Sequence, residues 1–415
     1  MNGESGNWNS GSAGPRQSNN NNPDNNWNNV AARGRCDAPR RKVHRSRLVT
    51  RPPGPTSHQV VSPFVPLRQI QNRIGIAGSR SRNPRPQFMG QKFRNLLPRI
   101  VEPDNLREAY RRARRDKRMT IGHLEFKEHA EANLARIGRD LADGVYSVGP
   151  YQTFTIHEPK AREIMALPFY DRVVQHAICN VVEPIFEAIL MPMCAACRVG
   201  KGTHYGVIRA QSHMRRLAQA GQVYCLKMDF QKYFANIDRS VLIREIRRKI
   251  SCEATMRLIE TITPPTGKGL PIGNLTSQLW ANLYGHIFDR FLVHECGVRF
   301  ATRYMDDTVV FGNDLDELRQ LKARIDDFVA GTMLLKFSKW SIQPITRGVN
   351  FLGYRIWTTH RLLRRDSVQR AKRKLRWLRA HGDKEDLRRF VASWSGHASW
   401  ADSRNLLASL QLVLC

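Results

Sequence analysis

Two adjacent aspartates interrupt an apolar stretch and constrain the fold of this chain more than any other feature. Asp306 and Asp307 lie between residues 301–303 and 308–311, which favour strands. Strands joined by so short a connection form a tight hairpin with both carboxylates at its apex. Neighbouring carboxylates repel each other, so the pair is costly unless cations bind there. An ordinary acidic turn is the alternative for these two residues taken alone.

A third acid strengthens the prediction of a cation site. Asp229 follows the apolar segment 223–228, which predicts a buried strand. Three carboxylates at strand ends provide the oxygen ligands that Mg²⁺ prefers. Two such ions, about 4 Å apart, activate an attacking 3′-hydroxyl and stabilise a leaving pyrophosphate. The sequence therefore predicts a site for two Mg²⁺ ions at Asp229, Asp306 and Asp307.

The charge of the chain indicates its partner. The 415 residues include 67 Lys and Arg against 36 Asp and Glu, a formal net charge of +31, and 41% are hydrophobic. A protein with a core and this charge is expected to bind a polyanion, and nucleic acid is the simplest choice. Since no run of about 18 apolar residues occurs, no membrane partner is expected. The eight scattered cysteines favour a reducing, cytoplasmic compartment.

The basic residues are unevenly placed. The first 100 residues contain 17 Lys and Arg but only three Asp and Glu. Residues 1–36 form an Asn-rich, low-complexity head, and residues 37–92 form a basic linker rich in Pro and Arg. Neither segment has enough apolar residues for a core, so we expect a disordered basic N-terminal extension.

The rest of the chain mixes predicted helices and strands without regular alternation, which favours the α+β class. Strands are expected at 151–156, 223–228, 300–303, 308–311 and 349–356. Helices are expected at 104–117, 123–142, 171–190, 240–250, 275–294, 315–330, 366–380 and 386–412.

Ordered motifs over residues 95–410 resemble those of reverse transcriptases. Residues 160–164 with 168 and 171–175, then 197–204, look like two fingers motifs. Residues 226–238, 269–278 and 304–307 look like palm motifs A, B and C, Lys339 like the motif D lysine, and 350–354 like the primer-grip motif. The resemblance implies a right-hand polymerase with fingers at 93–222, a palm with a small antiparallel sheet at 223–357, and a helical thumb at 358–415.

The resemblance also implies the carbonyl of Phe230 as an extra metal ligand and assigns roles to further residues. The residues implied to meet the incoming dNTP are Lys160, Arg162, Phe234, Ile272, Gly273 and Gln278, with Phe234 as the steric gate against a ribonucleotide 2′-hydroxyl. The residues implied to meet template or primer are Arg198, Lys201, Tyr304, Met305, Lys339, Phe351, Leu352 and Gly353. Arg198 and Lys201 could equally be surface charges.

Motif B indicates which kind of reverse transcriptase the chain resembles. Most reverse transcriptases have Gln-Gly-x-x-x-Ser-Pro, whereas this chain has Ile272-Gly273-Asn274-Leu275-Thr276-Ser277-Gln278, which is similar to reverse transcriptases of diversity-generating retroelements. Those enzymes copy a template-repeat RNA into cDNA with errors at adenine, for mutagenic retrohoming into a variable repeat. Loss of a polar side chain at Ile272 would lower fidelity. The head at 1–36 would then be a template repeat read through as protein, or else a plain polar linker.

This resemblance further implies the partners of the chain. They are the template-repeat RNA, a primer or cDNA, and a small basic accessory protein that forms a pentamer, in the cytoplasm of a bacterium or archaeon or encoded by a phage. Two alternatives stay open. One is a group II intron or retron-type reverse transcriptase, and the other is a non-catalytic RNA-binding relative.

Overall fold

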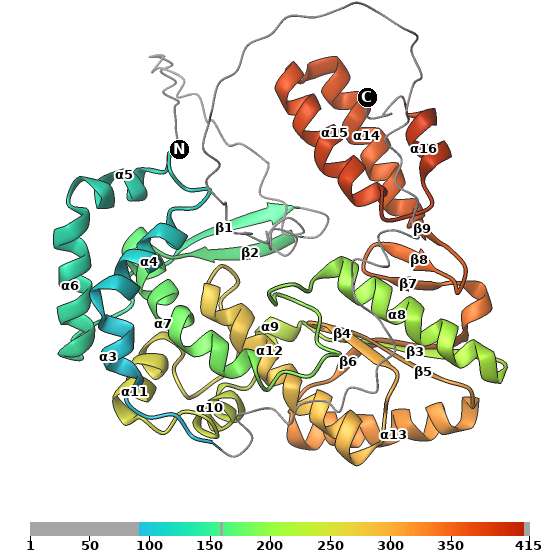
Figure 1. Cartoon of the computed structure of the whole chain (residues 1–415), viewed down its shortest axis with the longest axis horizontal. Helices are drawn as coiled ribbons and strands as arrows, with labels where there is room; N and C mark the ends of the chain where they lie inside the picture. Colours follow the sequence, from blue (N-terminus) through green and yellow to red (C-terminus); the bar gives the residue numbers. More distant parts are fainter. Residues whose placement is uncertain (1–90, 158–160, 411–415) are drawn as a thin grey trace, which may run out of the picture.

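The structure is a computed structural model that describes residues 91–157 and 161–410. The predictions for the head, for almost all of the linker and for Lys160 lie outside the described residues. The described part is a mixture of helices and antiparallel sheets, so the predicted α+β class is confirmed (Figure 1).

Helices dominate the first part of the described chain. They are α3 (Leu96–Val101), α4 (Pro103–Ala113), α5 (Ile121–Glu128), α6 (Ala130–Ala142) and α7 (Phe169–Glu187). The buried residues of α4, Leu106, Ala109 and Ala113, follow a helical spacing and pack towards α7. The single helix predicted over 123–142 is wrong, because the backbone of His129 leaves the helical region and separates α5 from α6.

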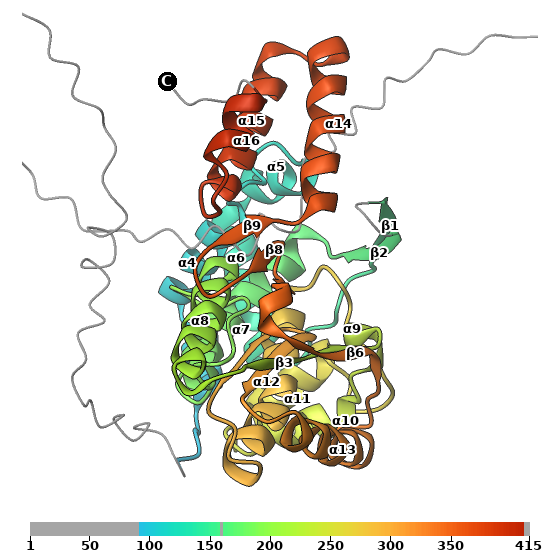
Figure 2. The same ribbon diagram turned by 90° about the vertical axis from the view of Figure 1, so that its right-hand side faces the viewer.

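A two-stranded hairpin projects from this helical part. Strand β1 (Gln152–His157) pairs with β2 (Ala161–Ala166) in antiparallel register. The prediction included a strand at the position of β1 but none at β2. In Figure 2 the hairpin stands at the side of the molecule, away from the helices α3 and α4.

A four-stranded antiparallel sheet forms the centre of the molecule, in the order β4-β5-β3-β6. Its strands are β3 (Tyr224–Phe230), β4 (Ala301–Tyr304), β5 (Asp307–Gly312) and β6 (Phe337–Pro344). Successive side chains of a strand point to opposite faces. Leu226 and Met228 enter one apolar cluster, whereas Cys225 and Val309 enter another, so both faces of the sheet are covered.

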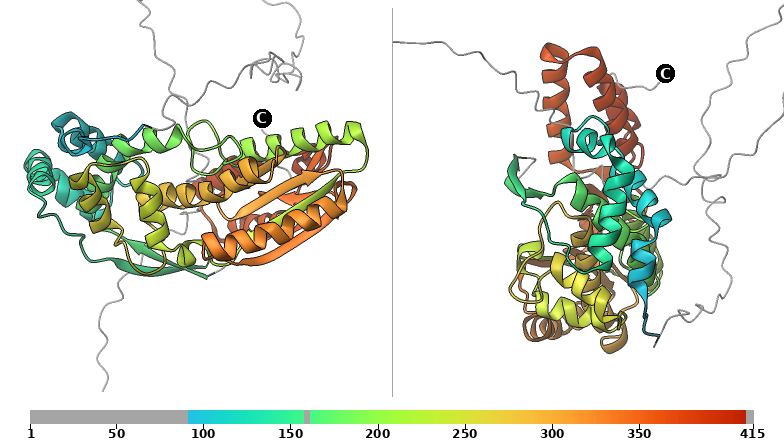
Figure 3. Two further views of the ribbon diagram at one scale, coloured as in Figure 1. Left: turned by 90° about the horizontal axis from the view of Figure 1, so that it is seen from below. Right: turned by 90° about the vertical axis from the view of Figure 1, so that its left-hand side faces the viewer.

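Different helices cover the two faces of the central sheet. Helices α12 (Leu275–Arg290) and α13 (Leu315–Thr332) contribute to the cluster around Met228, together with α10 (Arg239–Arg247) and α11 (Glu253–Ile262). Helix α8 (Thr203–Leu217) and a three-stranded sheet within residues 349–363 contribute to the cluster around Cys225. Figure 3 shows α8 and α13 on opposite sides of the strands.

The C-terminal part begins with the sheet β7 (Val349–Phe351), β8 (Tyr354–Ile356) and β9 (Arg361–Leu363). The single strand predicted over 349–356 is wrong, because Leu352 and Gly353 both have positive φ and reverse the chain. Helices α14 (Arg365–His381), α15 (Lys384–Ala398) and α16 (Arg404–Ser409) follow and stand above the sheets (Figure 2). Among the described residues, no helix combines the length and apolarity needed to cross a membrane.

Candidate active site

The central sheet brings the three predicted carboxylates together. Asp229 near the end of β3 lies directly opposite Asp307 at the start of β5. Directly paired residues point to the same face of a sheet, so both carboxylates lie on the face that α8 and the β7–β8 hairpin cover. Asp306 precedes Asp307 in the turn between β4 and β5. The strand pair and tight acidic turn predicted from the sequence are confirmed.

The turn that carries Asp306 has an unusual backbone. Tyr304 pairs with Asp307, so only Met305 and Asp306 connect the two strands. Met305 has a φ of 54°, in the left-handed region that a side chain disfavours. The carbonyl of Asp306 accepts a hydrogen bond of 3.2 Å from the backbone N–H of Phe230. This bond ties the turn to the end of β3, next to Asp229.

The three acids create a focus of negative charge. Burial and the neighbouring charge of Asp229 raise the pKa of Asp306 to about 6, although the positive charge of Arg162 opposes the shift. Burial also raises the pKa of Asp307, against the lowering effect of Lys227. Buried carboxylates that repel one another favour either protonation or a bound cation.

Lys227 contacts the candidate site and was not identified from the sequence. It lies two residues before Asp229 on β3, and therefore on the same face. Its Nζ is 3.2 Å from a carboxylate oxygen of Asp307 and donates a 2.7 Å hydrogen bond to the carbonyl of Asn350 in β7. The period of two along β3 was the signal that could have identified it.

Strand β6 adds a second contact that was not predicted. The hydroxyl of Ser338 donates hydrogen bonds to a carboxylate oxygen of Asp229 at 3.0 Å and to its carbonyl at 3.1 Å. The adjacent Lys339, predicted as a template or primer contact, is exposed and lies opposite Asp229 in the sheet register.

The carboxylates do not converge as a ligand set in the described part of the chain, where no group of three or more His, Cys, Asp and Glu side chains is arranged around a common point. Asp307 is turned towards Lys227, and Asp229 is held by Ser338. The site nevertheless fits a cation, because Oδ1 of Asp307 is buried without a hydrogen-bond partner. A buried oxygen of this kind is costly unless something binds it.

Backbone contacts join the loop before α12 to strand β2. The carbonyl of Ile272 accepts a 2.8 Å hydrogen bond from the N–H of Met165. Gly273 has a φ of 138°, and a Cβ atom there would clash with the carbonyl of Met165. The predicted residue Arg162 lies on the same strand, so the fold brings the β1–β2 hairpin and the loop before α12 together. Gln278 lies one turn into α12 and is half-buried.

Phe234 lies on a short helix, α9 (Tyr233–Asn236), directly after β3. Its carbonyl accepts a 2.8 Å hydrogen bond from the N–H of Leu270, and its half-buried ring meets the ring of Tyr233 edge-on. The predicted gate residue therefore lies between β3 and the loop that leads to Gly273.

Arg198 is not the template contact or surface charge that the sequence suggested. Its side chain is only 4% exposed and forms an ion pair with Glu187 at 2.6 Å. It also donates hydrogen bonds to the carbonyls of Met191 and Cys194. With these donors engaged inside the protein, Arg198 is a buried residue of the framework. Lys201 is half-buried nearby, 3.9 Å from the same glutamate, and burial lowers its pKa to about 8.

The predicted primer-grip residues lie in the turn between β7 and β8. Phe351 is buried, and Leu352 and Gly353 form the turn. Leu352 packs against α8 so closely that a Cβ atom on Gly206 would lie 2.7 Å from its side chain. Of the two predicted residues in the catalytic hairpin, Tyr304 is half-buried and Met305 is buried. The bond from Lys227 to Asn350 connects the β7–β8 hairpin to the carboxylates.

Comparison with known proteins identifies the segment that holds this site. Residues 156–356 match the family model described as "Reverse transcriptase (RNA-dependent DNA polymerase)". Similar curated proteins include Nuclear intron maturase 4, mitochondrial, of Arabidopsis thaliana, with 24% identity over 49% of this chain and 26% of the relative. Protein YkfC of Escherichia coli is 26% identical over 49% of this chain and 58% of its own length.

A third relative is the Group II intron-encoded protein LtrA of Lactococcus lactis, with 24% identity over 48% of this chain and 35% of the relative. The chain thus spans between about a quarter and three fifths of the lengths of these relatives. Among solved structures, an apo telomerase from Candida Tropicalis aligns with a TM-score of 0.42 and 11% identity, over 52% of this chain and 55% of that one. The segment that holds the three carboxylates, residues 156–356, is thus similar to the reverse transcriptase (RNA-dependent DNA polymerase) family.

Proposed function

We propose that this protein is an RNA-directed DNA polymerase that extends a primer on an RNA template with dNTPs. The observation that carries the proposal is the pairing of Asp229 with Asp307 beside Asp306, on one face of a sheet within the family segment. The basic composition of the chain supports a nucleic-acid partner. The division into fingers at 93–222, palm at 223–357 and thumb at 358–415 belongs to this proposal.

Asp229, Asp306 and Asp307, with the carbonyl of Phe230, are the residues that would hold two Mg²⁺ ions. Bound there, the ions would activate the 3′-hydroxyl of the primer and stabilise the pyrophosphate. The unpartnered oxygen of Asp307 and the raised pKa of Asp306 support this assignment.

Other side chains of the site would position the reactants. Arg162 carries positive charge towards the carboxylates from β2 and would bind the triphosphate with Lys160, since a guanidinium can fork to phosphate oxygens. Phe234 would exclude a 2′-hydroxyl, and Ile272, Gly273 and Gln278 would line the pocket of the nascent base pair. Lys339, Tyr304, Met305 and the turn at Phe351, Leu352 and Gly353 would contact template or primer.

The test is extension of a primer on RNA with Mg²⁺ and dNTPs. Activity in the wild type that Asp306→Ala abolishes supports the proposal. A wild type that binds the primer–template and does not extend it would instead favour a non-catalytic RNA-binding protein.

For the finer class, two candidate functions have specific support. The names of the similar proteins include an intron maturase and a group II intron-encoded protein, which favours an enzyme of the group II intron or retron type. The Ile-Gly-x-x-x-Ser-Gln form of motif B favours the reverse transcriptase of a diversity-generating retroelement. That second candidate would copy a template-repeat RNA with errors at adenine and would act with a small basic pentameric accessory protein.

Ile272→Gln separates these two candidates. The backbone bond from Met165 to the Ile272 carbonyl does not involve the side chain, so it can persist in the variant. If Ile272 lowers fidelity, misincorporation opposite template adenine falls by about 10- to 100-fold in the variant, while Ile272→Val leaves it unchanged. An error spectrum that does not change at adenine removes the support that motif B lends to the retroelement class.

A further inference from the structure

Arg303 is the largest charged side chain that is fully enclosed near the carboxylates. It lies on β4, three residues before Asp306, and both it and its partner Asp289 on α12 are 0% exposed. Arg303 pairs with Thr308, which directly follows Asp307 on β5. Successive residues of a strand point to opposite faces, so the side chain of Arg303 points to the face of the sheet opposite the carboxylates. It therefore lies beneath the turn and not in the substrate space above it.

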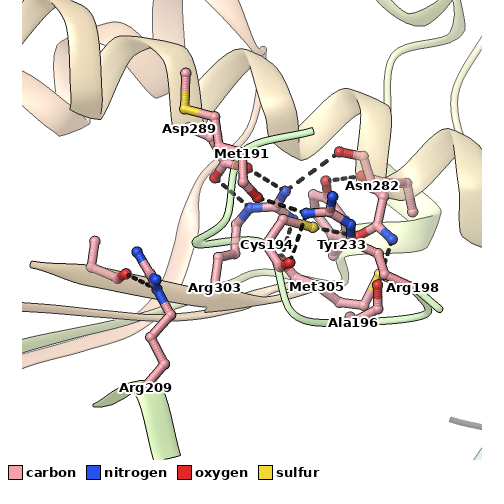
Figure 4. A network of polar contacts seen from close by, with 12 residues as sticks. Met191, Cys194, Ala196, Arg198, Arg209, Tyr233, Asn282, Asp289, Arg303 and Met305 are labelled. Carbon is pink, nitrogen blue, oxygen red and sulfur yellow. Dashed lines mark hydrogen bonds and ion pairs between the residues drawn. The ribbon is translucent and has the colours of Figure 1, made fainter. Parts of the chain in front are cut away.

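The guanidinium is fixed by a two-pronged ion pair. Its Nε and Nη2 each lie 2.7 Å from a carboxylate oxygen of Asp289. Because the guanidinium is planar, two bonds to one carboxylate also fix the direction in which its third nitrogen donates. That nitrogen, Nη1, donates a 3.1 Å hydrogen bond to the carbonyl of Met305, as Figure 4 shows.

Met305 is the residue of the turn that most needs such support. Its φ of 54° is unfavourable for a side chain, and strained residues persist only where the surrounding structure holds them. The peptide that Arg303 holds is the one that leads directly into Asp306. A shift of this peptide would move both Asp306 and Asp307 relative to Asp229.

The surrounding residues are shaped to hold Arg303 in place. Gly285 on α12 lies against the guanidinium, and a Cβ atom there would clash with it. The carbonyl of Asn282 accepts a 3.4 Å bond from Nη2, and the side chain of Asn282 contacts Cys194 and the carbonyl of Ala196. Helix α12 begins at the motif B loop, so the helix that anchors Arg303 also carries the proposed nucleotide pocket.

We propose that Arg303 is a positioning residue that uses its ion pair with Asp289 to hold the Met305 carbonyl, and with it the turn that presents Asp306 and Asp307. This inference rests on the proposed polymerase function. Arg303 touches no reacting atom in this account, and it acts only through the turn.

The chain offers a matched control in Arg198. Arg198 is also enclosed, with a side chain 4% exposed, and it forms an ion pair with Glu187 and hydrogen bonds to Met191 and Cys194. It belongs to the same network as Arg303 in Figure 4 but contacts no residue of the turn. A lysine at either position keeps the charge and loses the fork, and the two pairs differ in that Glu187 is 35% exposed whereas Asp289 is fully buried.

The test compares Arg303→Lys with Arg198→Lys in the full chain. Both are expected to lower the melting temperature. Only Arg303→Lys is expected to slow single-turnover nucleotide addition, by about a hundredfold, with the Kd for dNTP within about twofold of wild type. The burst amplitude gives the active fraction, so partial unfolding is separated from a slower step. Equal rates in the two variants, after this correction, overturn the proposal.

A second measurement does not depend on turnover. Mn²⁺ binding to the apoprotein, followed by electron paramagnetic resonance, should weaken several-fold in Arg303→Lys and not in Arg198→Lys, because only the former disturbs the carboxylates. If Arg303→Lys does not fold, Asp289→Asn keeps the volume and the arginine, and the same two results are expected. Unchanged Mn²⁺ binding in a folded variant refutes the role of Arg303, whereas an inactive wild type that binds Mn²⁺ refutes only the polymerase function.

Discussion

Lys227 and Asp307 lie side by side on one face of the central sheet, with the lysine Nζ 3.2 Å from a carboxylate oxygen of the aspartate. The positive charge of Lys227 therefore competes with a cation for this oxygen. Loss of a unit charge at such a distance is worth about 1 to 4 kcal/mol. We expect Lys227→Gln to lower the Mg²⁺ concentration for half-maximal thermal stabilisation by about tenfold.

Lys339→Gln is the control for this prediction. Lys339 is exposed on β6 opposite Asp229, and its replacement removes the same charge without touching Asp307. A smaller shift is expected there, since solvent screens an exposed charge. If both variants lower the Mg²⁺ concentration for half-maximal stabilisation equally, Lys227 acts only through the net charge of the protein.

The raised pKa of Asp306 predicts how stability changes with pH in the metal-free protein. Burial and the charge of Asp229 move this pKa from 3.8 to about 6. Below pH 3.8 the group is protonated in both folded and unfolded states and has no effect. The folded state becomes destabilised as the pH rises towards 6, because it binds more protons than the unfolded chain in this interval.

Asp306→Asn should therefore be more stable than wild type at pH 8 in EDTA, by no more than about 3 kcal/mol, and equal to it near pH 3.5. Addition of Mg²⁺ at pH 8 should stabilise the wild type and leave the variant almost unchanged. Urea unfolding at the two pH values measures this directly. If Asp306→Asn is less stable than wild type at pH 8 without metal, repulsion between Asp306 and Asp229 does not destabilise the folded protein.

Phe234 is expected to select deoxyribonucleotides. Its position between β3 and the loop at Leu270 suits a ring that fills the space of a 2′-hydroxyl. Phe234→Ala should raise the efficiency of ribonucleotide addition, relative to the matching deoxyribonucleotide, by about 10- to 100-fold. Tyr233→Phe is the control, since it keeps the neighbouring ring and removes only the hydroxyl that donates to Ala281. An unchanged ratio in Phe234→Ala would assign the ring to packing alone.

An aromatic contact attaches the C-terminal helices to α8. Trp400 stacks on His204 with ring centres 4.1 Å apart, and Tyr354 bonds to His397 at 2.9 Å. Trp400 is 37% exposed, so it lies at the edge of the C-terminal helices and not in their core.

Trp400→Ala should loosen these helices and accelerate limited proteolysis at residues 399–403, by up to about tenfold. The dissociation of a primer–template should accelerate in parallel. Trp400→Phe keeps a stacking ring and should resemble wild type. Equal proteolysis in all three proteins would show that the stack does not hold the helices.

The hairpin that carries Asp306 and Asp307 could be predicted because its signals are local. Apolar strands flank Asp306 and Asp307, and the apolar run before Asp229 ends where the strand ends. Strand β6 could not be predicted, because none of its eight residues from Phe337 to Pro344 is buried and they show no alternation, as expected of an edge strand. The contact of Ser338 with Asp229 was therefore hidden as well.

Long-range pairing explains the remaining errors. In the sequence, Arg198 resembles a surface charge. Its ion pair with Glu187, at the end of α7, forms only in the folded chain. Helix α8 has its buried residues Val207, Ala210 and Met214 at helical spacing, but glycine and basic residues between them weaken the pattern. Leu352 adopts a positive φ that its residue type does not suggest, so the β7–β8 hairpin was read as one strand.

The central claim is that Asp229, Asp306 and Asp307 catalyse RNA-templated DNA synthesis. The most direct measurement is single-turnover addition of one dNTP to a DNA primer on RNA, with Mg²⁺, for wild type, Asp307→Asn and Asp316→Asn. Asp316 is an exposed acid on α13, so its variant controls for the loss of charge. Addition is expected for wild type and Asp316→Asn, and a loss of at least about a thousandfold is expected for Asp307→Asn. Equal addition by all three proteins, or none by wild type bound to the primer–template, would contradict the central claim.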